Sequence, residues 1–168
     1  MTNLIEGNII DIHTDTIYPA KLTIKDGKII EIIKTNKIYS NYIAPGFIDS
    51  HVHIESSLLI PARFAEAAIP HGTIGCVSDP HEIANVCGIE GIEFMINNGL
   101  TVPFYFSFGV PSSVPSTKFE SNGASIDNEE VKFIFEKFKL KYLSEVMNYP
   151  GVINQEKTII TLISVIYM

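Results

Sequence analysis

Two histidines separated by a single residue, His51 and His53, constrain this chain more than any other feature. They end the segment APGFIDSHVH, residues 44–53, whose apolar lead-in is typical of a buried strand. In an extended strand, residues i and i+2 point to the same side. Two imidazoles held in this way can both bind one metal ion. The pattern therefore predicts a metal site at the end of a strand.

The composition indicates a folded, acidic chain and argues against several classes of function. The 168 residues are 46% hydrophobic and 18% charged, which is typical of a globular protein. The formal net charge is −7 and Arg63 is the single arginine, so we expect no nucleic-acid partner. No apolar run approaches the roughly 20 residues that span a bilayer, so we expect no membrane partner. Cys76 and Cys87 form no CxxC motif, and without a recognisable signal peptide we expect free thiols and a cytoplasmic location.

The first forty residues are predicted to form a small β unit. Residues 4–10, 20–24 and 28–33 have the apolar, β-branched composition of strands. The dipeptide Asp26-Gly27 between the last two is a strong signal for a hairpin turn.

After Pro45-Gly46 the pattern changes to strands that alternate with helices, which is typical of a parallel sheet covered by helices. Asp127 is predicted to cap the last helix. We therefore expect an α/β fold in this part of the chain. The predicted strands are residues 47–52, 73–77, 102–106 and 142–146, and the predicted helices are residues 61–68, 90–97 and 129–138.

Polar residues follow or end these predicted strands, where β/α barrels carry their chemistry. The first strand leads to the two histidines, and the second leads to a cluster that would either support the site or merely cap a helix. We therefore expect one candidate site at this end of the sheet. Its further members are Glu55, Ser56, Asp79, His81, Glu82, Glu145 and Asn148.

The segment of residues 44–53 resembles the signature of the amidohydrolase superfamily. Within that superfamily, HIESS at 53–57, DPHEIANV at 79–86 and MNYPGVI at 147–153 are similar to the adenine deaminases. The resemblance covers roughly residues 1–154. One departure is Ser113, which stands where the resemblance implies a cysteine.

The resemblance implies an architecture of which this chain holds only a part. Residues 1–43 would be a portion of an N-terminal β-sandwich, and residues 44–154 would form about the first four βα units of a (β/α)8 TIM-type barrel. Residues 155–168 would be a tail that does not match. We therefore expect a truncated product that is inactive alone and that either associates with itself or needs a separate C-terminal chain.

The resemblance also implies a binuclear metal centre that deaminates adenine to hypoxanthine and ammonia. His51 and His53 would bind the more buried metal, and Glu145 would bridge to the second. Manganese or iron would suit imidazole and carboxylate ligands, with zinc as a further possibility. A bound divalent metal lowers the pKa of a water molecule to about 7, which would supply the nucleophile. The remaining ligands and the proton-shuttling aspartate would lie outside this chain.

The other predicted site residues would contact the substrate or support the ligands. These are Glu55, Ser56, Asp79, His81, Glu82 and Asn148. Two alternatives stay open on the sequence. One is a cyclic amidohydrolase of the dihydroorotase or hydantoinase type, and the other is a non-catalytic remnant.

Overall fold

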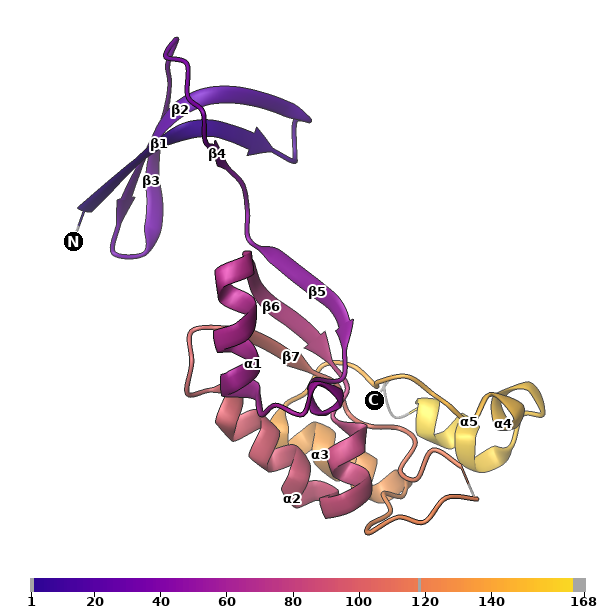
Figure 1. The fold of residues 1–168 in the computed structure, drawn as a ribbon. Helices are drawn as coiled ribbons and strands as arrows, with labels where there is room; N and C mark the ends of the chain where they lie inside the picture. The colour runs from indigo at the N-terminus through magenta and orange to yellow at the C-terminus, as the bar shows by residue number, and fades with distance from the viewer. Residues whose placement is uncertain (1, 118, 165–168) are drawn as a thin grey trace. The chain divides into compact units, whose positions relative to one another are not determined.

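A computed structural model describes residues 2–117 and 119–164, and the chain divides into two compact units, residues 1–46 and 47–168 (Figure 1). The fold is a mixture of sheets and helices, as the sequence predicts. None of the helices in the described ranges combines the length and the apolar character that crossing a membrane requires.

The first unit is one four-stranded sheet in the order β3-β2-β1-β4. β1 pairs antiparallel with β2, and β2 with β3, whereas the short β4 lies parallel to β1. Asp26 and Gly27 turn the chain between β2 and β3 with φ angles of 50° and 76°, as a two-residue hairpin of this hand requires. The predicted hairpin is therefore confirmed. The strands are β1 (Thr2–Asp11), β2 (Thr16–Lys25), β3 (Lys28–Lys34) and β4 (Tyr42–Ile43).

The second unit is built on a parallel sheet in the order β5-β6-β7. α1 connects β5 to β6, and α2 connects β6 to β7, so the predicted alternation of strands and helices is confirmed. The strands are β5 (Phe47–Val52), β6 (Thr73–Ser78) and β7 (Tyr105–Phe108). The helices are α1 (Pro61–Ala68), α2 (His81–Gly99), α3 (Asn128–Phe138), α4 (Tyr149–Ile153) and α5 (Lys157–Ser164), with short 3-10 helices η1 (Ile54–Ser57) and η2 (Ile69–His71).

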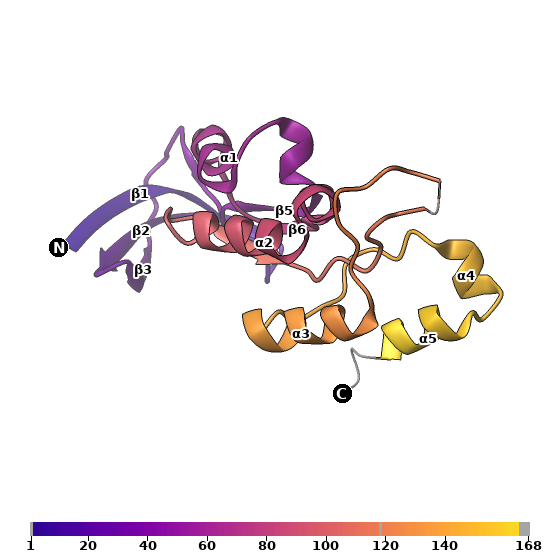
Figure 2. The ribbon, with the colours of Figure 1, turned by 90° about the horizontal axis from the view of Figure 1, so that it is seen from below.

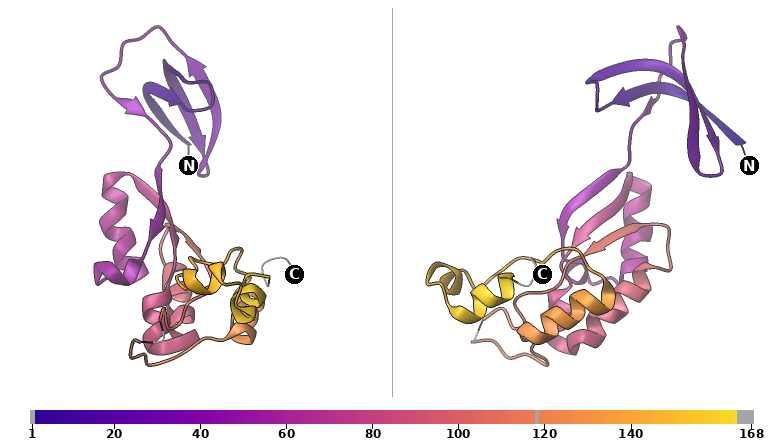
Figure 3. Two further views of the ribbon diagram at one scale, coloured as in Figure 1. Left: turned by 90° about the vertical axis from the view of Figure 1, so that its right-hand side faces the viewer. Right: turned by 180° about the vertical axis from the view of Figure 1, so that it is seen from behind.

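Two apolar clusters hold the second unit together. One lies between the sheet and its helices and joins Ile54, Ala65, Cys76, Met95, Phe104 and Phe108. The other joins α2, α3 and α5 and includes Ile92, Ile134 and Leu162. Figure 2 and Figure 3 show α2 and α3 side by side, as this shared cluster requires. The histidines and acidic residues at the C-terminal ends of β5 and β6 belong to neither cluster.

Three predicted elements differ from the structure. The helix predicted over residues 90–97 begins already at His81, because α2 continues across a kink at Gly88, where φ is 59°. The third strand starts at Tyr105 rather than at residue 102. The fourth strand, predicted over residues 142–146, is reduced to one parallel bridge between Val110 and Leu143. Pro111 follows that bridge directly, and proline is poorly suited to continuing a ladder because it has no N–H.

The predicted N-cap of α3 is confirmed and gives a stability prediction. Asp127 accepts hydrogen bonds from the backbone N–H groups of Glu129 at 3.0 Å and Glu130 at 2.9 Å, and the Glu130 carboxylate accepts from the Asp127 N–H. We expect Asp127→Ala to lower the free energy of unfolding in urea by about 1 kcal/mol. Asp127→Asn keeps an acceptor and should retain most of the stability. Equal losses in the two variants would contradict the capping role.

The two cysteines should differ in reactivity. Cys76 is buried in the core of the second unit, and this burial raises the pKa of its thiol to about 12, whereas Cys87 is exposed. Because the thiolate is the reactive form, Cys76 stays inert below that pKa. At pH 8 we expect a disulfide reagent to modify one thiol per folded chain. Cys87→Ser should abolish this reaction and Cys76→Ser should not; rapid labelling of the Cys87→Ser variant would contradict the burial.

The open edge of the parallel sheet leads to a prediction about association. β5 lies at this edge, and its residues Phe47 and Ile48 are 66% and 60% exposed. Exposed apolar edge strands pair readily with other chains. In light scattering after gel filtration, we expect a mass that rises with concentration above 18.6 kDa. Ile48→Lys should reduce the association, and Ile38→Lys, in a loop of the first unit, should not; a monodisperse monomer would contradict the prediction.

Candidate metal centre

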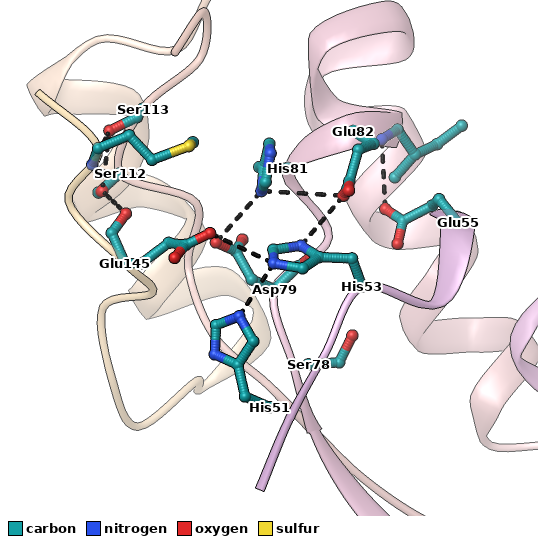
Figure 4. Close-up of polar contacts among 12 residues, drawn as sticks. His51, His53, Glu55, Ser78, Asp79, His81, Glu82, Ser112, Ser113 and Glu145 are labelled. Carbon is teal, nitrogen blue, oxygen red and sulfur yellow. Dashed lines mark hydrogen bonds and ion pairs between the residues drawn. The ribbon is translucent and has the colours of Figure 1, made fainter. Parts of the chain in front are cut away.

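The ends of two neighbouring parallel strands bring a cluster of imidazoles and carboxylates together (Figure 4). His51 lies in β5, and His53 follows that strand directly, at the start of η1. Asp79 follows β6, and His81 begins α2. Since parallel strands end at the same edge of a sheet, these side chains from distant parts of the sequence meet.

The two histidines predicted from the strand period lie against each other. Their Nε2 atoms are 3.0 Å apart, and their ring centroids are 4.9 Å apart. Two nitrogens that bind one metal ion at about 2.1 Å and at a right angle to each other would be separated by about 3.0 Å. The spacing of the imidazoles therefore suits a shared cation.

His53 is the residue to which the other groups converge. Its Nε2 lies 3.2 Å from Oε1 of Glu145. On the opposite side of the ring, Nδ1 lies 3.1 Å from the carbonyl oxygen of Asp79 and 3.2 Å from Oε2 of Glu82. Metal-binding histidines are usually held in this way, with the second ring nitrogen fixed by a carbonyl or carboxylate oxygen.

Asp79 and His81 add two further donors beside this group. Nδ1 of His81 lies 3.3 Å from Oδ2 of Asp79 and 3.8 Å from Oε2 of Glu82. The nearby Asp79 carboxylate raises the pKa of the His81 imidazole above its usual value. Ligand atoms of His53, Asp79, His81 and Glu145 all lie within 4.8 Å of one another. The sequence predicted Asp79 and His81 only as supporting or capping groups, and their geometry makes them candidate ligands as well.

The unsatisfied polar atoms of the cluster fit a divalent cation. Both carboxylate oxygens of Asp79, Nδ1 of His81 and Oε2 of Glu82 are buried without a well-formed hydrogen bond to a described residue. Oδ2 of Asp79, Nδ1 of His81 and Oε2 of Glu82 have imidazole or carboxylate neighbours only at ion-pair distances of 3.2 to 3.8 Å. Buried polar atoms are normally hydrogen-bonded, and a carboxylate that is only 4% exposed is costly when its polar contacts are incomplete. A cation held by imidazole nitrogens and carboxylate oxygens would satisfy these atoms.

Glu55 and Ser56 support the cluster from η1. Oε1 of Glu55 accepts the N–H of Ile83 at 3.2 Å, and burial raises the pKa of this carboxyl group. The Ser56 hydroxyl donates to Oε1 of Glu82 at 2.9 Å. Both residues thus fix the first turn of α2 and, through it, the carboxylate that faces His53.

Asn148 takes a different place from the other predicted site residues. Its Oδ1 accepts the N–H of Gly151 at 3.1 Å, and it is the N-cap of α4. Among the described residues, this side chain contacts its own helix rather than the histidines and carboxylates.

Three residues that the sequence did not single out as site residues hold the segment that carries Glu145. The Ser112 hydroxyl donates to the Glu145 carbonyl at 2.6 Å, and Oγ of Ser113 accepts the N–H of Met147 at 3.1 Å. The Tyr142 hydroxyl lies within hydrogen-bond distance of the carbonyl oxygens of Ser78 and Ser107. The position of the two serines after a predicted strand is a weak signal for a site residue. Their hydrogen bonds to the backbone of Glu145 and Met147 could not be predicted from the sequence.

A hollow of about 310 Å³ opens beside the cluster and is lined by residues that include His51, Asp79 and Glu145. This volume lies at the lower end of the range for pockets that hold small ligands.

Comparisons with known proteins show which proteins the chain resembles. The chain is 50% identical over 155 residues to the adenine deaminase of Parabacteroides distasonis, an alignment that covers 92% of this chain and 28% of that protein. It is 49% identical over 150 residues to the adenine deaminase of Salinibacter ruber, which covers 89% of this chain and 28% of that protein. For the adenine deaminase of Methanosphaera stadtmanae the identity is 46% over 162 residues, with 96% and 30% covered.

The chain thus spans less than a third of the length of these curated relatives. A model of the amidohydrolase family matches residues 42–166, which include the whole cluster of histidines and carboxylates. Because the match covers most of the chain, the protein belongs to the amidohydrolase family.

Proposed function

We propose that this chain carries the divalent-metal site of an adenine deaminase, which converts adenine and water to hypoxanthine and ammonia. The observation that carries the proposal is the position of Nε2 of His53, 3.0 Å from Nε2 of His51 and 3.2 Å from Oε1 of Glu145. An imidazole nitrogen of His51 and a carboxylate oxygen of Glu145, donors of the types that bind manganese, iron or zinc, thus each lie beside Nε2 of His53. His51 is not among the four residues whose ligand atoms all lie within 4.8 Å of one another, so its share in the site rests on its contact with His53. The names of the curated relatives support adenine as the substrate.

In this proposal the residues of the cluster have distinct roles. His51 and His53 would hold one metal ion, and the Glu145 carboxylate beside His53 would be shared between that ion and a second one. When bound, the metal lowers the pKa of a water molecule and so makes a nucleophile available at neutral pH. The carbonyl of Asp79 and the carboxylate of Glu82 hold a proton on Nδ1 of His53. The lone pair of Nε2 is thereby left free to face the ligand position.

The remaining predicted residues have two kinds of role. Glu55 and Ser56 fix the turn that carries Glu82. Asp79 and His81 are either additional ligands or substrate contacts. Asn148 stays a proposed substrate contact whose side chain also caps α4.

The fold proposal follows from the same family. We propose that the run from β5 to α3, together with the bridge at Leu143, is the first part of a TIM-type (β/α)8 barrel. We also propose that the sheet of the first unit is a portion of a β-sandwich. All seven residues of β3 are exposed, including Ile29, Ile30, Ile32 and Ile33, which supports a further layer over this sheet.

A chimera tests the function directly. Residues 1–154 of this chain replace the matching part of the Parabacteroides distasonis adenine deaminase, and ammonia release from adenine and bound metal are measured together. We expect a metal-dependent activity. His51→Ala, His53→Ala and Glu145→Gln should each lower the activity by about a hundredfold or more and reduce the metal content, because each removes a ligand. His71→Ala is a matched control at an exposed histidine and should change neither quantity.

The same chimera separates the alternatives. Hydrolysis of dihydroorotate or hydantoin without adenine turnover would favour a cyclic amidohydrolase. A folded chimera that turns over none of these compounds would favour a non-catalytic remnant. Should Glu145→Gln leave both activity and metal content intact, the bridging role would be wrong.

A further inference from the structure

We propose that Ser112 is a positioning residue that directs the carboxylate of Glu145 toward His53 by holding the backbone of Glu145. The inference rests on the proposed function, in which Glu145 is a metal ligand. It assigns a role to a residue whose hydroxyl contacts Ser113 and the Glu145 backbone rather than the imidazoles.

The segment that carries Glu145 has little backbone support of its own. It is joined to the loop after β7 by one bridge, in which the Val110 N–H donates to the Tyr142 carbonyl at 3.0 Å and the Ser144 N–H donates to the Val110 carbonyl at 2.9 Å. Beyond this bridge no strand pairing is described before α4 begins at Tyr149. A strand ladder therefore does not fix Glu145.

Two buried serines take the place of that ladder. Ser112 and Ser113 are 8% and 6% exposed, and their Oγ atoms are 3.3 Å apart. The proton of the Ser112 hydroxyl is used by the Glu145 carbonyl, which only accepts, at 2.6 Å. The hydrogen bond between the serines must therefore use the proton of Ser113.

The contacts form one continuous chain of hydrogen bonds. The Met147 N–H donates to Oγ of Ser113, Ser113 donates to Oγ of Ser112, and Ser112 donates to the Glu145 carbonyl (Figure 4). Each hydroxyl donates in one direction and accepts from the other, which strengthens the chain. It begins and ends on one short stretch of backbone, so it fixes that stretch on both sides of residue 146.

The fixed backbone matters because the Glu145 side chain has few restraints. It is 41% exposed, and among the described residues its carboxylate contacts Nε2 of His53 through Oε1. Without a fixed carbonyl, rotation about the backbone would turn this carboxylate toward solvent. Removal of the Ser112 hydroxyl breaks the chain in the middle and leaves the Glu145 carbonyl without its donor.

Cobalt binding by the complete 168-residue chain tests the inference, because Co²⁺ reports both affinity and ligand geometry through its visible absorption. For Ser112→Ala we expect a dissociation constant about tenfold higher and an altered spectrum, the usual size of effect for a group that orients a ligand. Ser112→Thr and Ser112→Val form a pair of equal volume that differs in the hydroxyl, and only the valine variant should show the loss. This pair also decides the matter if the alanine variant does not fold.

Ser144→Ala is the matched control. This serine precedes Glu145 and is buried, but its hydroxyl has no hydrogen bond to any described residue, so its removal should leave affinity and spectrum unchanged.

Glu145→Gln identifies the route by which Ser112 acts. Because the effect passes through the Glu145 carboxylate, Ser112→Ala should cause no further loss of Co²⁺ affinity in the Glu145→Gln background. A purely structural role would lower the urea midpoint and leave the spectrum unchanged. That result would overturn the inference. Equal Co²⁺ affinity of Ser112→Ala and the unmodified chain would also overturn it, and so would a full tenfold loss of affinity in the Glu145→Gln background. Each of these outcomes would leave the proposed metal centre in place. An unmodified chain that binds no Co²⁺ would overturn the proposed metal centre and the inference with it.

Discussion

The site depends on the position of one imidazole ring, that of His53, whose two nitrogens face different partners. Nδ1 is held by the Asp79 carbonyl and by Glu82, and Nε2 faces His51 and Glu145. These partners come from β5, from the residue after β6, from α2 and from the segment around Glu145. The His53 ring therefore takes this position only when all four parts of the chain are correctly placed. A parallel sheet makes this convergence possible, because the ends of its strands share one edge.

The polar cluster is costly to the fold, which is itself informative. Asp79 is 4% exposed, and among the described residues its carboxylate has no well-formed hydrogen bond and one ion-pair contact, with Nδ1 of His81 at 3.3 Å. The burial of apolar side chains in the clusters around Cys76 and Ile92 stabilises the fold and offsets the free-energy cost of burying these polar groups. The apolar core packs between the sheet and its helices, and the incompletely paired polar groups lie at the strand ends. This arrangement is expected of a site that binds a cation.

Local patterns predicted those parts of the structure that are decided locally. The period of a strand placed His51 beside His53, the Asp26-Gly27 dipeptide placed the hairpin, and Asp127 placed the start of α3. These features depend on neighbours within a few residues. The start of α2 was missed because a glycine at residue 88 disguises a helix that runs across a kink.

Contacts between distant segments were not predictable in the same way. Ser112 contacts Glu145 across 33 positions of sequence, and no periodicity connects the two. The expected fourth strand shrank to the bridge at Leu143, since the loop that would pair with it turns away at Pro111. The closeness of Asp79 and His81 to the ligand position likewise depends on where β6 ends, which the sequence indicated only through the order of its strands.

The central claim is that His51, His53 and Glu145 together hold a divalent metal ion. An anomalous difference map from crystals of the complete chain soaked in Mn²⁺ tests it most directly. We predict a peak about 2.1 Å from Nε2 of both histidines and bonded to the Glu145 carboxylate. A map without a peak between these groups, or a peak held by Asp79 and His81 without His51, would contradict the account.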